Sequence, residues 1–247
     1  MRRLRALARL AHAVVHGLHG LALVLFSFPS LSLDARRERI RWWSNKMLAV
    51  LGVAFECHGV PRREASLLVV NHVSWLDIMA VHAVVPEARF VSKADVKGWP
   101  LVSRLVDSAG TLYLERERKR DALRVVHAIA EALAAGQVVA IFPEGTTSTG
   151  HGLLPFHANL LQAAIATATP VQPVALRFAD TTDAVSAAVE FIGDTSLLTS
   201  LWRTSCGNGV RVRLTFLPPR PTQGVERRAL AEVLRADIAA ALGVPAP

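Results

Sequence analysis

His72 and Asp77 are the two side chains of this sequence best suited to acid–base chemistry, and four residues separate them. A neutral histidine can take a proton from a hydroxyl, while a nearby carboxylate holds the imidazole in one tautomer and stabilises its charged form. The same segment has a structural interpretation, because Ser74 and Asp77 have the spacing of a helix capping box. The pair alone therefore predicts either a general base with its orienting carboxylate or the start of a helix.

An apolar segment, residues 66–70, precedes His72 and predicts a buried strand. Ligands of open α/β sheets bind beyond the carboxyl ends of the strands, where His72 would lie. Two further apolar segments lead into polar residues in the same way: residues 111–114 are followed by Glu115-Arg116, and residues 138–142 by Pro143-Glu144-Gly145.

These strand ends can converge on one edge of a sheet, which would place the cation of Arg116, the carboxylate of Glu144 and the flexible backbone of Gly145 beside His72. Such a set suits the transfer of an acyl group to a hydroxyl of an anionic acceptor. The base would take the hydroxyl proton, the alkoxide would attack a thioester, and the cation would hold the acceptor's phosphate or carboxylate.

The elements that must position these residues alternate between strands and helices from Phe55 onward. This alternation predicts an α/β fold with a mixed, largely parallel sheet flanked by helices. Pro173 has no N–H to donate, so its segment is predicted to be an edge strand or to be bulged. The predicted strands cover residues 55–60, 66–70, 89–91, 111–114, 138–142, 171–176, 187–192 and 210–217, and the predicted helices 78–85, 119–135, 157–168 and 225–242.

The N-terminal residues differ from the rest, and we assign residues 1–54 to membrane-associating helices and residues 55–247 to a second domain. Residues 1–46 hold nine basic and two acidic side chains, a charge of +7 out of a total of +8. Residues 10–33 lack charged side chains and are long enough to span a membrane. Basic residues on both flanks favour a segment that enters and leaves on one side, with a true span or a cleaved signal as alternatives.

A second predicted helix, residues 35–54, places arginines beside Trp42-Trp43, which suits the boundary of an anionic membrane or the docking of an ordinary amphipathic helix. The basic excess lies at one end and no nucleic-acid-binding motif accompanies it, so nucleic acid is not an expected partner. Cys57 and Cys206 lie far apart, which argues against a disulfide framework and fits a reducing compartment. His58, His151 and His157 lack metal-ligand spacing, so we predict no metal site.

Four blocks of the sequence, taken in order, resemble those of the 1-acylglycerol-3-phosphate acyltransferase family of lysophospholipid acyltransferases. They are residues 71–77, 110–116, 142–146 and 171–174. The resemblance implies that His72 deprotonates the acceptor hydroxyl while Asp77 orients it. It also implies direct transfer from acyl-CoA or acyl carrier protein, without a cofactor or an acyl-enzyme.

The resemblance further implies a binding site for the acceptor phosphate at Arg116 and the loop Glu144-Gly145-Thr146. A carboxylate does not bind phosphate directly, so Glu144 is expected to organise basic side chains or the loop. Members of the family are commonly held on the membrane by N-terminal helices, which leads us to expect the cytoplasmic face of the inner membrane.

Thr147 stands where the family usually has an arginine. A guanidinium binds phosphate bidentately, whereas threonine offers a neutral hydroxyl. Lys93 or Lys97 could replace this charge, or both could be solvated surface lysines. Residues 191–198, with Trp202, resemble a subgroup that includes lyso-ornithine lipid acyltransferases.

The expected activity is therefore formation of phosphatidic acid from lysophosphatidic acid. Acylation of lyso-ornithine lipid, whose zwitterionic headgroup lacks a phosphate, is the alternative. A non-catalytic protein of the membrane surface is the third hypothesis.

Overall fold

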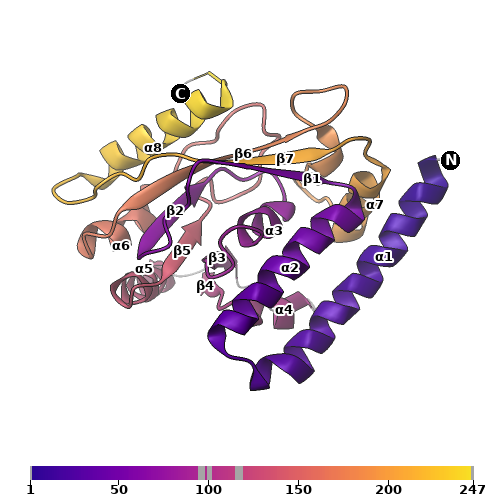
Figure 1. The fold of residues 1–247 in the computed structure, drawn as a ribbon. Helices are drawn as coiled ribbons and strands as arrows, with labels where there is room; N and C mark the ends of the chain where they lie inside the picture. The colour runs from indigo at the N-terminus through magenta and orange to yellow at the C-terminus, as the bar shows by residue number, and fades with distance from the viewer. Residues whose placement is uncertain (1, 94–97, 99–101, 115–118, 246–247) are drawn as a thin grey trace.

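The computed structural model describes residues 2–93, 98, 102–114 and 119–245. Within these ranges one seven-stranded sheet runs in the order β1-β7-β6-β2-β5-β3-β4 (Figure 1). All neighbouring strands are parallel except β6 and β7. The predicted mixed, largely parallel sheet is confirmed. The strands are β1 (Ala54–His58), β2 (Ser66–Val70), β3 (Arg89–Lys93), β4 (Leu112–Leu114), β5 (Val138–Ile141), β6 (Val171–Ala179) and β7 (Arg211–Phe216).

Helices cover both faces of the sheet (Figure 1). Leu68 and Val70 of β2 pack in a cluster with α2 and α3, whereas Leu67 and Val69 pack in a second cluster with α5, α6 and α8. Successive side chains of a strand point to opposite faces, so an apolar run such as β2 serves both clusters. The helices are α1 (Arg2–Ala22), α2 (Leu33–Leu51), α3 (Leu76–His82), α4 (Val102–Ser108), α5 (Lys119–Ala134), α6 (Leu161–Ala166), α7 (Leu197–Cys206) and α8 (Arg227–Leu242).

Two of the predicted strand properties are wrong. Residues 187–192 contain a 3₁₀ turn, Ala187–Val189, capped by the Ser186 side chain. The segment cannot pair with β6, because β7 and β2 already occupy both sides of that strand. β6 is therefore an inner strand, although Pro173 predicted an edge or a bulge.

The neighbours of Pro173 explain how an inner strand tolerates this residue. Its carbonyl accepts a hydrogen bond from the Leu217 N–H at 3.0 Å, so its nitrogen faces Leu217 as well. The Leu217 carbonyl, which an N–H at position 173 would otherwise reach, accepts from the Gln172 side-chain amide at 2.9 Å. A side chain thus replaces the missing backbone donor, and no carbonyl is left without a partner at this point.

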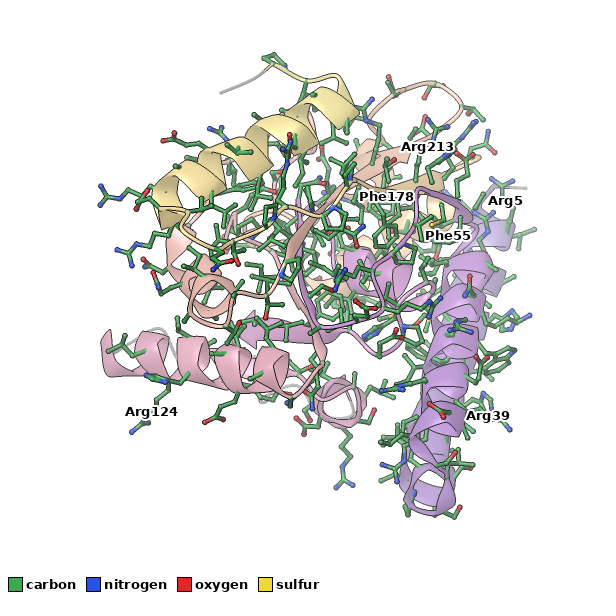
Figure 2. All side chains as sticks on the ribbon, turned by 60° about the vertical axis from the view of Figure 1, so that its left-hand side comes forward. Arg5, Arg39, Phe55, Arg124, Phe178 and Arg213 are labelled. Carbon is green, nitrogen blue, oxygen red and sulfur yellow. The ribbon has the colours of Figure 1, made fainter. Side chains whose placement is uncertain are left out.

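The N-terminal helices form a hairpin along one side of the molecule, where Arg5 and Arg39 are labelled in Figure 2. His16 Nε2 donates to the Trp43 carbonyl and Trp43 Nε1 donates to the His16 carbonyl, both at 3.0 Å. The helices approach closely at Gly20, where a Cβ would lie 2.3 Å from Trp43 Nε1. Any larger residue at position 20 would push α1 away from α2.

α1 presents two different stripes. Ala6, Ala13 and His16 are buried, while large apolar side chains on the other side are exposed. Within the described residues, one helical stretch, Arg3–Ser30, is long and apolar enough to cross a membrane. The exposed apolar side chains of this stretch are Leu4, Leu7, Val14, Val15, Leu18, Leu25 and Phe26.

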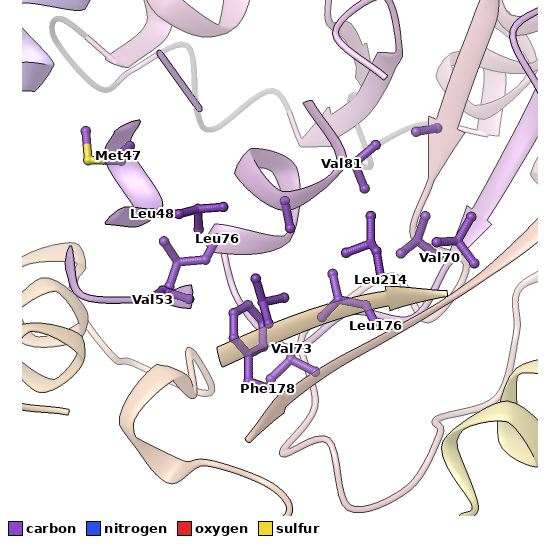
Figure 3. Close-up of a cluster of buried hydrophobic side chains, with 14 of the residues drawn as sticks. Met47, Leu48, Val53, Val70, Val73, Leu76, Val81, Leu176, Phe178 and Leu214 are labelled. Atoms are coloured by element: carbon purple, nitrogen blue, oxygen red, sulfur yellow. The ribbon is translucent and has the colours of Figure 1, made fainter. Parts of the chain in front are cut away.

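α2 belongs to the hydrophobic core as well as to the hairpin (Figure 3). Met47, Leu48 and Leu51 are buried in the cluster that includes Leu76 of α3 and Leu214 of β7. Removal of the whole hairpin would therefore expose core side chains, and tests of its role require substitutions on its outer surface.

His82 on α3 predicts a pH dependence of stability. It is 4% exposed, and its Nε2 donates to the Ala88 carbonyl at 3.0 Å. Burial lowers the pKa of His82 from its ordinary 6.5 to about 4. The unfolded chain binds this proton more readily, so the stabilising effect is complete above pH 6.5 and is lost as the pH falls toward 4.

We expect the free energy of unfolding to fall by up to about 3 kcal/mol across this window because of His82 alone. Chemical denaturation of the wild type and of His82→Gln at pH 7 and pH 4.5 measures this contribution. Glutamine can donate to the same carbonyl but does not titrate, so its stability should fall less. Equal losses in the two proteins would contradict the assignment.

Candidate active site

His72 and Asp77 meet directly beyond the carboxyl end of β2. His72 Nδ1 lies 2.7 Å from Asp77 Oδ2, and the Asp77 side chain is fully buried. A carboxylate only accepts hydrogen bonds, so in the neutral imidazole the proton is on Nδ1 and the lone pair is on Nε2. This arrangement leaves Nε2 able to accept a proton, which is the chemistry that a general base requires.

Asp77 also closes the turn before α3. Its Oδ2 accepts hydrogen bonds from the N–H groups of Val73, at 2.7 Å, and Ser74, at 3.0 Å. One half of the capping box is therefore present. The other half is absent, because α3 begins after Trp75 and the buried Ser74 hydroxyl has no partner in the described part of the chain. The structural and catalytic interpretations of Asp77 are compatible, since one oxygen serves both.

Phe142, at the end of β5, holds the plane of the imidazole. Its ring is stacked on His72 with centroids 3.9 Å apart and an interplanar angle of 11°. Phe142 stacks in turn on Phe90 of β3, at 5.5 Å. Sequence analysis placed Phe142 at the end of a predicted strand and in the third family block but gave its side chain no role in the site.

The loop after β5 binds the main chain of His72 on both sides. Glu144 Oε1 accepts from the His72 N–H at 2.7 Å, and the Ser148 N–H donates to the His72 carbonyl at 2.8 Å. Gly145 adopts a positive φ of 69°, a conformation that a side chain would disfavour, and its N–H bonds the Phe142 carbonyl. Two loops from neighbouring parallel strands are thereby locked together at the histidine.

Both carboxylate oxygens of Glu144 are engaged inside the protein. Oε2 accepts from the Leu154 N–H at 2.9 Å, and the residue is 3% exposed. Burial raises the pKa of this carboxyl, while the two backbone donors oppose the rise. Glu144 therefore has the contacts expected of a residue that organises the loop. A direct contact between this carboxylate and a phosphate was not expected, because both are negatively charged.

The structure describes only some of the remaining predicted substrate-binding residues. Thr146 is exposed on the loop after β5. Lys93 ends β3, which lies beside β5, although the structure does not describe its side chain. Arg116 and Lys97 lie outside the described residues. The strand before Arg116, β4, is parallel to β3, so its carboxyl end points to the same edge of the sheet as His72.

Thr147, the position that departs from the family pattern, is hydrogen-bonded to residues 187–192, the segment that was wrongly predicted to be a strand. Its hydroxyl donates to the Phe191 carbonyl, and the Phe191 N–H donates to the Val73 carbonyl at 3.4 Å. Further along, Trp75 Nε1 donates to the Ser200 hydroxyl of α7 at 3.1 Å. The segment from 187 to 206 therefore contacts both the loop after β2 and the loop after β5. Ser196, whose side chain caps α7, was the one local signal of this helix.

Known proteins resemble this chain in sequence and in fold. A family model described as Acyltransferase matches residues 54–177. The lyso-ornithine lipid O-acyltransferase of Pseudomonas aeruginosa is 38% identical over 257 residues, which cover 100% of this chain and 97% of the relative. The 1-acyl-sn-glycerol-3-phosphate acyltransferase of Neisseria meningitidis is 37% identical over 187 residues, covering 74% of this chain and 72% of the relative.

A solved structure shares the fold. The crystal structure of the 1-acyl-sn-glycerophosphate (LPA) acyltransferase PlsC from Thermotoga maritima superposes with a TM-score of 0.72 at 20% identity and covers 98% of both chains. At this identity the likeness concerns the arrangement of helices and strands. It extends over the N-terminal hairpin as well as the sheet.

Proposed function

The chain belongs to the Acyltransferase family, and from this premise we propose that it transfers a fatty acyl group from a thioester donor to the free hydroxyl of a lysolipid. The observation that carries the proposal is the 2.7 Å contact between His72 and Asp77 beyond the carboxyl end of β2. This contact leaves Nε2 as the basic nitrogen of a ring held in place by Phe142. Arg116, Lys93 and the loop from Glu144 to Thr146 would position the acceptor.

In the proposed reaction, His72 Nε2 takes the proton of the acceptor hydroxyl as its oxygen attacks the thioester carbonyl. A C–O bond forms, the C–S bond breaks, and the leaving thiolate takes the proton back from His72. Asp77 stabilises the imidazolium between these events. The donor is acyl-CoA or acyl carrier protein, no residue becomes acylated, and the scheme requires no cofactor.

The first acceptor that we propose is 1-acylglycerol-3-phosphate, which would yield phosphatidic acid. The name of the Neisseria meningitidis relative supports it. Lyso-ornithine lipid is the second candidate, and a specific observation favours it: the Thr147 hydroxyl is bound to Phe191, so this position holds the protein together instead of supplying a cation. The Pseudomonas aeruginosa relative, which matches along its whole length, has this activity in its name.

A side-by-side assay with the two acceptors tests the proposal. We expect the wild type to acylate lysophosphatidic acid. We expect Thr147→Arg to raise kcat/KM for that acceptor relative to lyso-ornithine lipid by about tenfold, because a charge-assisted hydrogen bond contributes roughly 1.5–3 kcal/mol. Thr147→Val, which removes the bond to Phe191 without adding charge, is the control. Transfer to lyso-ornithine lipid alone would replace the first acceptor by the second, and transfer to neither would refute the function.

We also propose that residues 1–54 attach the acyltransferase domain, residues 55–247, to the cytoplasmic face of the inner membrane. The exposed apolar stripe of α1 supports this proposal, together with the basic charge of the same residues. An exposed apolar stripe beside basic and Trp side chains is typical of helices that lie in the membrane interface.

Replacement of exposed apolar side chains along the helical stretch Arg3–Ser30 is expected to weaken membrane binding. Val15, Leu18 and Phe26 are 63%, 54% and 81% exposed, so glutamine at all three positions should leave the core intact. Each lost apolar contact is worth up to about 1.5–3 kcal/mol, which predicts at least a tenfold loss in binding to anionic phospholipid vesicles. Leu123→Gln, also 63% exposed but on α5, is the matched control. Equal vesicle binding by the triple variant and the control would refute the anchor.

A further inference from the structure

A basic hollow of about 400 Å³ lies between the segment 155–159 and the first half of α8. Volumes of a few hundred Å³ are typical of small-molecule sites. The side chains that matter for its chemistry are Arg227, Arg228, Arg235, His157, Phe156 and Glu232. The family model ends at residue 177, before α8.

The hollow carries three guanidinium groups and one carboxylate. Within the described ranges none of the three arginines forms an ion pair; Arg235 donates to the Leu153 carbonyl at 2.6 Å, and its Nε is buried without a partner. Arg227 and Arg228 occupy the first turn of α8, where the helix dipole disfavours cations. Glu226 already caps this turn through the N–H groups of residues 228 and 229. The two arginines therefore do not stabilise the start of α8. The positive charge of the cluster suits an anionic ligand.

His157, which lines the hollow, and Leu154, just before the lining segment 155–159, are both bonded to the loop that holds His72. The His157 N–H donates to the Pro143 carbonyl at 2.8 Å, and the Leu154 N–H donates to Glu144 at 2.9 Å. Both acceptors belong to the turn after β5. The hollow thus lies at the same edge of the sheet as the general base.

The position of the hollow relative to the hairpin favours the acyl donor over the lipid acceptor as its ligand. Figures 1 and 2 both show α8 and α1 on opposite sides of the molecule, so the hollow, which α8 helps to form, lies on the side away from α1. A lipid acceptor would keep its headgroup at the membrane surface. An acyl-CoA donor, by contrast, carries its phosphates on a water-soluble end that the pantetheine arm separates from the thioester.

We propose that this hollow binds the phosphate groups of acyl-CoA, with Arg227 and Arg228 as the principal contacts. The inference rests on the proposed function and adds to it the site and the chemical class of the donor. Guanidinium groups recognise phosphate oxygens bidentately, and Phe156 offers an apolar surface for the base of the nucleotide.

The test measures donor use and donor binding in Arg227→Ala, Arg228→Ala and the double variant. We expect the double variant to raise the KM for acyl-CoA at least about tenfold, with kcat and the KM for the lysolipid within about twofold of the wild type. Neither side chain makes a hydrogen bond in the described structure, so folding should be unaffected. Arg211→Ala, which removes an exposed arginine of β7, is the matched control.

Calorimetric titration with coenzyme A itself supplies a readout that does not require turnover. The affinity should fall by a similar factor in the double variant. It should also be weaker for dephospho-coenzyme A than for coenzyme A in the wild type. Unchanged affinity in the double variant would overturn the proposal while leaving the proposed function in place, and a rise in the KM for the lysolipid instead would assign the hollow to the acceptor. A wild type that binds coenzyme A through these arginines but transfers no acyl group would refute only the proposed function.

Discussion

Substitution of His72 by alanine is expected to reduce kcat for acyl transfer by at least about 10³-fold. General-base catalysis alone contributes about 10²–10⁴-fold, and no other described side chain is bonded to Asp77 in the same way. The scaffold should survive the change, because Glu144 and Ser148 bind the main chain of His72 and not its ring. The loss should therefore appear in kcat, with little change in the thermal midpoint.

A matched variant separates this prediction from a general effect of losing a histidine. His151 is exposed on the loop after β5, and His151→Ala should retain nearly full activity. Steady-state rates of both variants with one donor and one acceptor provide the comparison. Comparable kcat values for His72→Ala and the wild type would remove His72 as the base.

Substitution of Asp77 by alanine should be nearly as damaging to activity and more damaging to stability. The change leaves the N–H groups of Val73 and Ser74 without the acceptor that they share, and each buried unsatisfied donor costs roughly 1–3 kcal/mol. It also frees the imidazole to adopt the wrong tautomer. We expect a loss of about 10³-fold or more in kcat, measured together with a lower denaturation midpoint.

Asp77→Asn separates the two roles of this carboxylate. An asparagine can keep the oxygen that accepts three hydrogen bonds, while its NH₂ group replaces Oδ1, which has no partner among the described residues. Orientation of His72 is then retained and only the negative charge is lost. The asparagine variant should keep the wild-type denaturation midpoint to within a few degrees and lose about 10–10³-fold in kcat. If the alanine and asparagine variants behave alike in both measurements, the separation of roles is wrong.

Local patterns in the sequence determined the parts of the fold that depend on neighbouring residues. The uncharged segment 66–70 predicted β2, and the apolar period of residues 119–135 predicted α5, because burial on two faces or on one stripe requires those spacings. The dyad was predictable for the same reason. His72 and Asp77 belong to one strand-to-helix turn, so their meeting depends on only a few backbone angles.

Contacts between distant segments were decided by the tertiary structure alone. Pro173 is tolerated in an inner strand because the Gln172 side chain donates to the Leu217 carbonyl. Residues 187–192 do not pair with β6, because β7 and β2 lie on its two sides. Glu144 was predicted as a candidate from its position, yet its bond to the His72 N–H follows only from the packing of β2 beside β5. Its bond to the Leu154 N–H follows from the path of its own loop.

The candidate donor site could not be predicted from local sequence patterns either. Arg227, Arg228 and His157 are separated by about seventy residues and have no common motif, so no local pattern brings them together. Propensity and periodicity act within a few turns of the chain, whereas the choice of partner for a backbone or charged group is a competition among all segments that the core brings into reach. The sequence therefore determined the candidate catalytic pair, His72 and Asp77, and the fold decided which residues surround it.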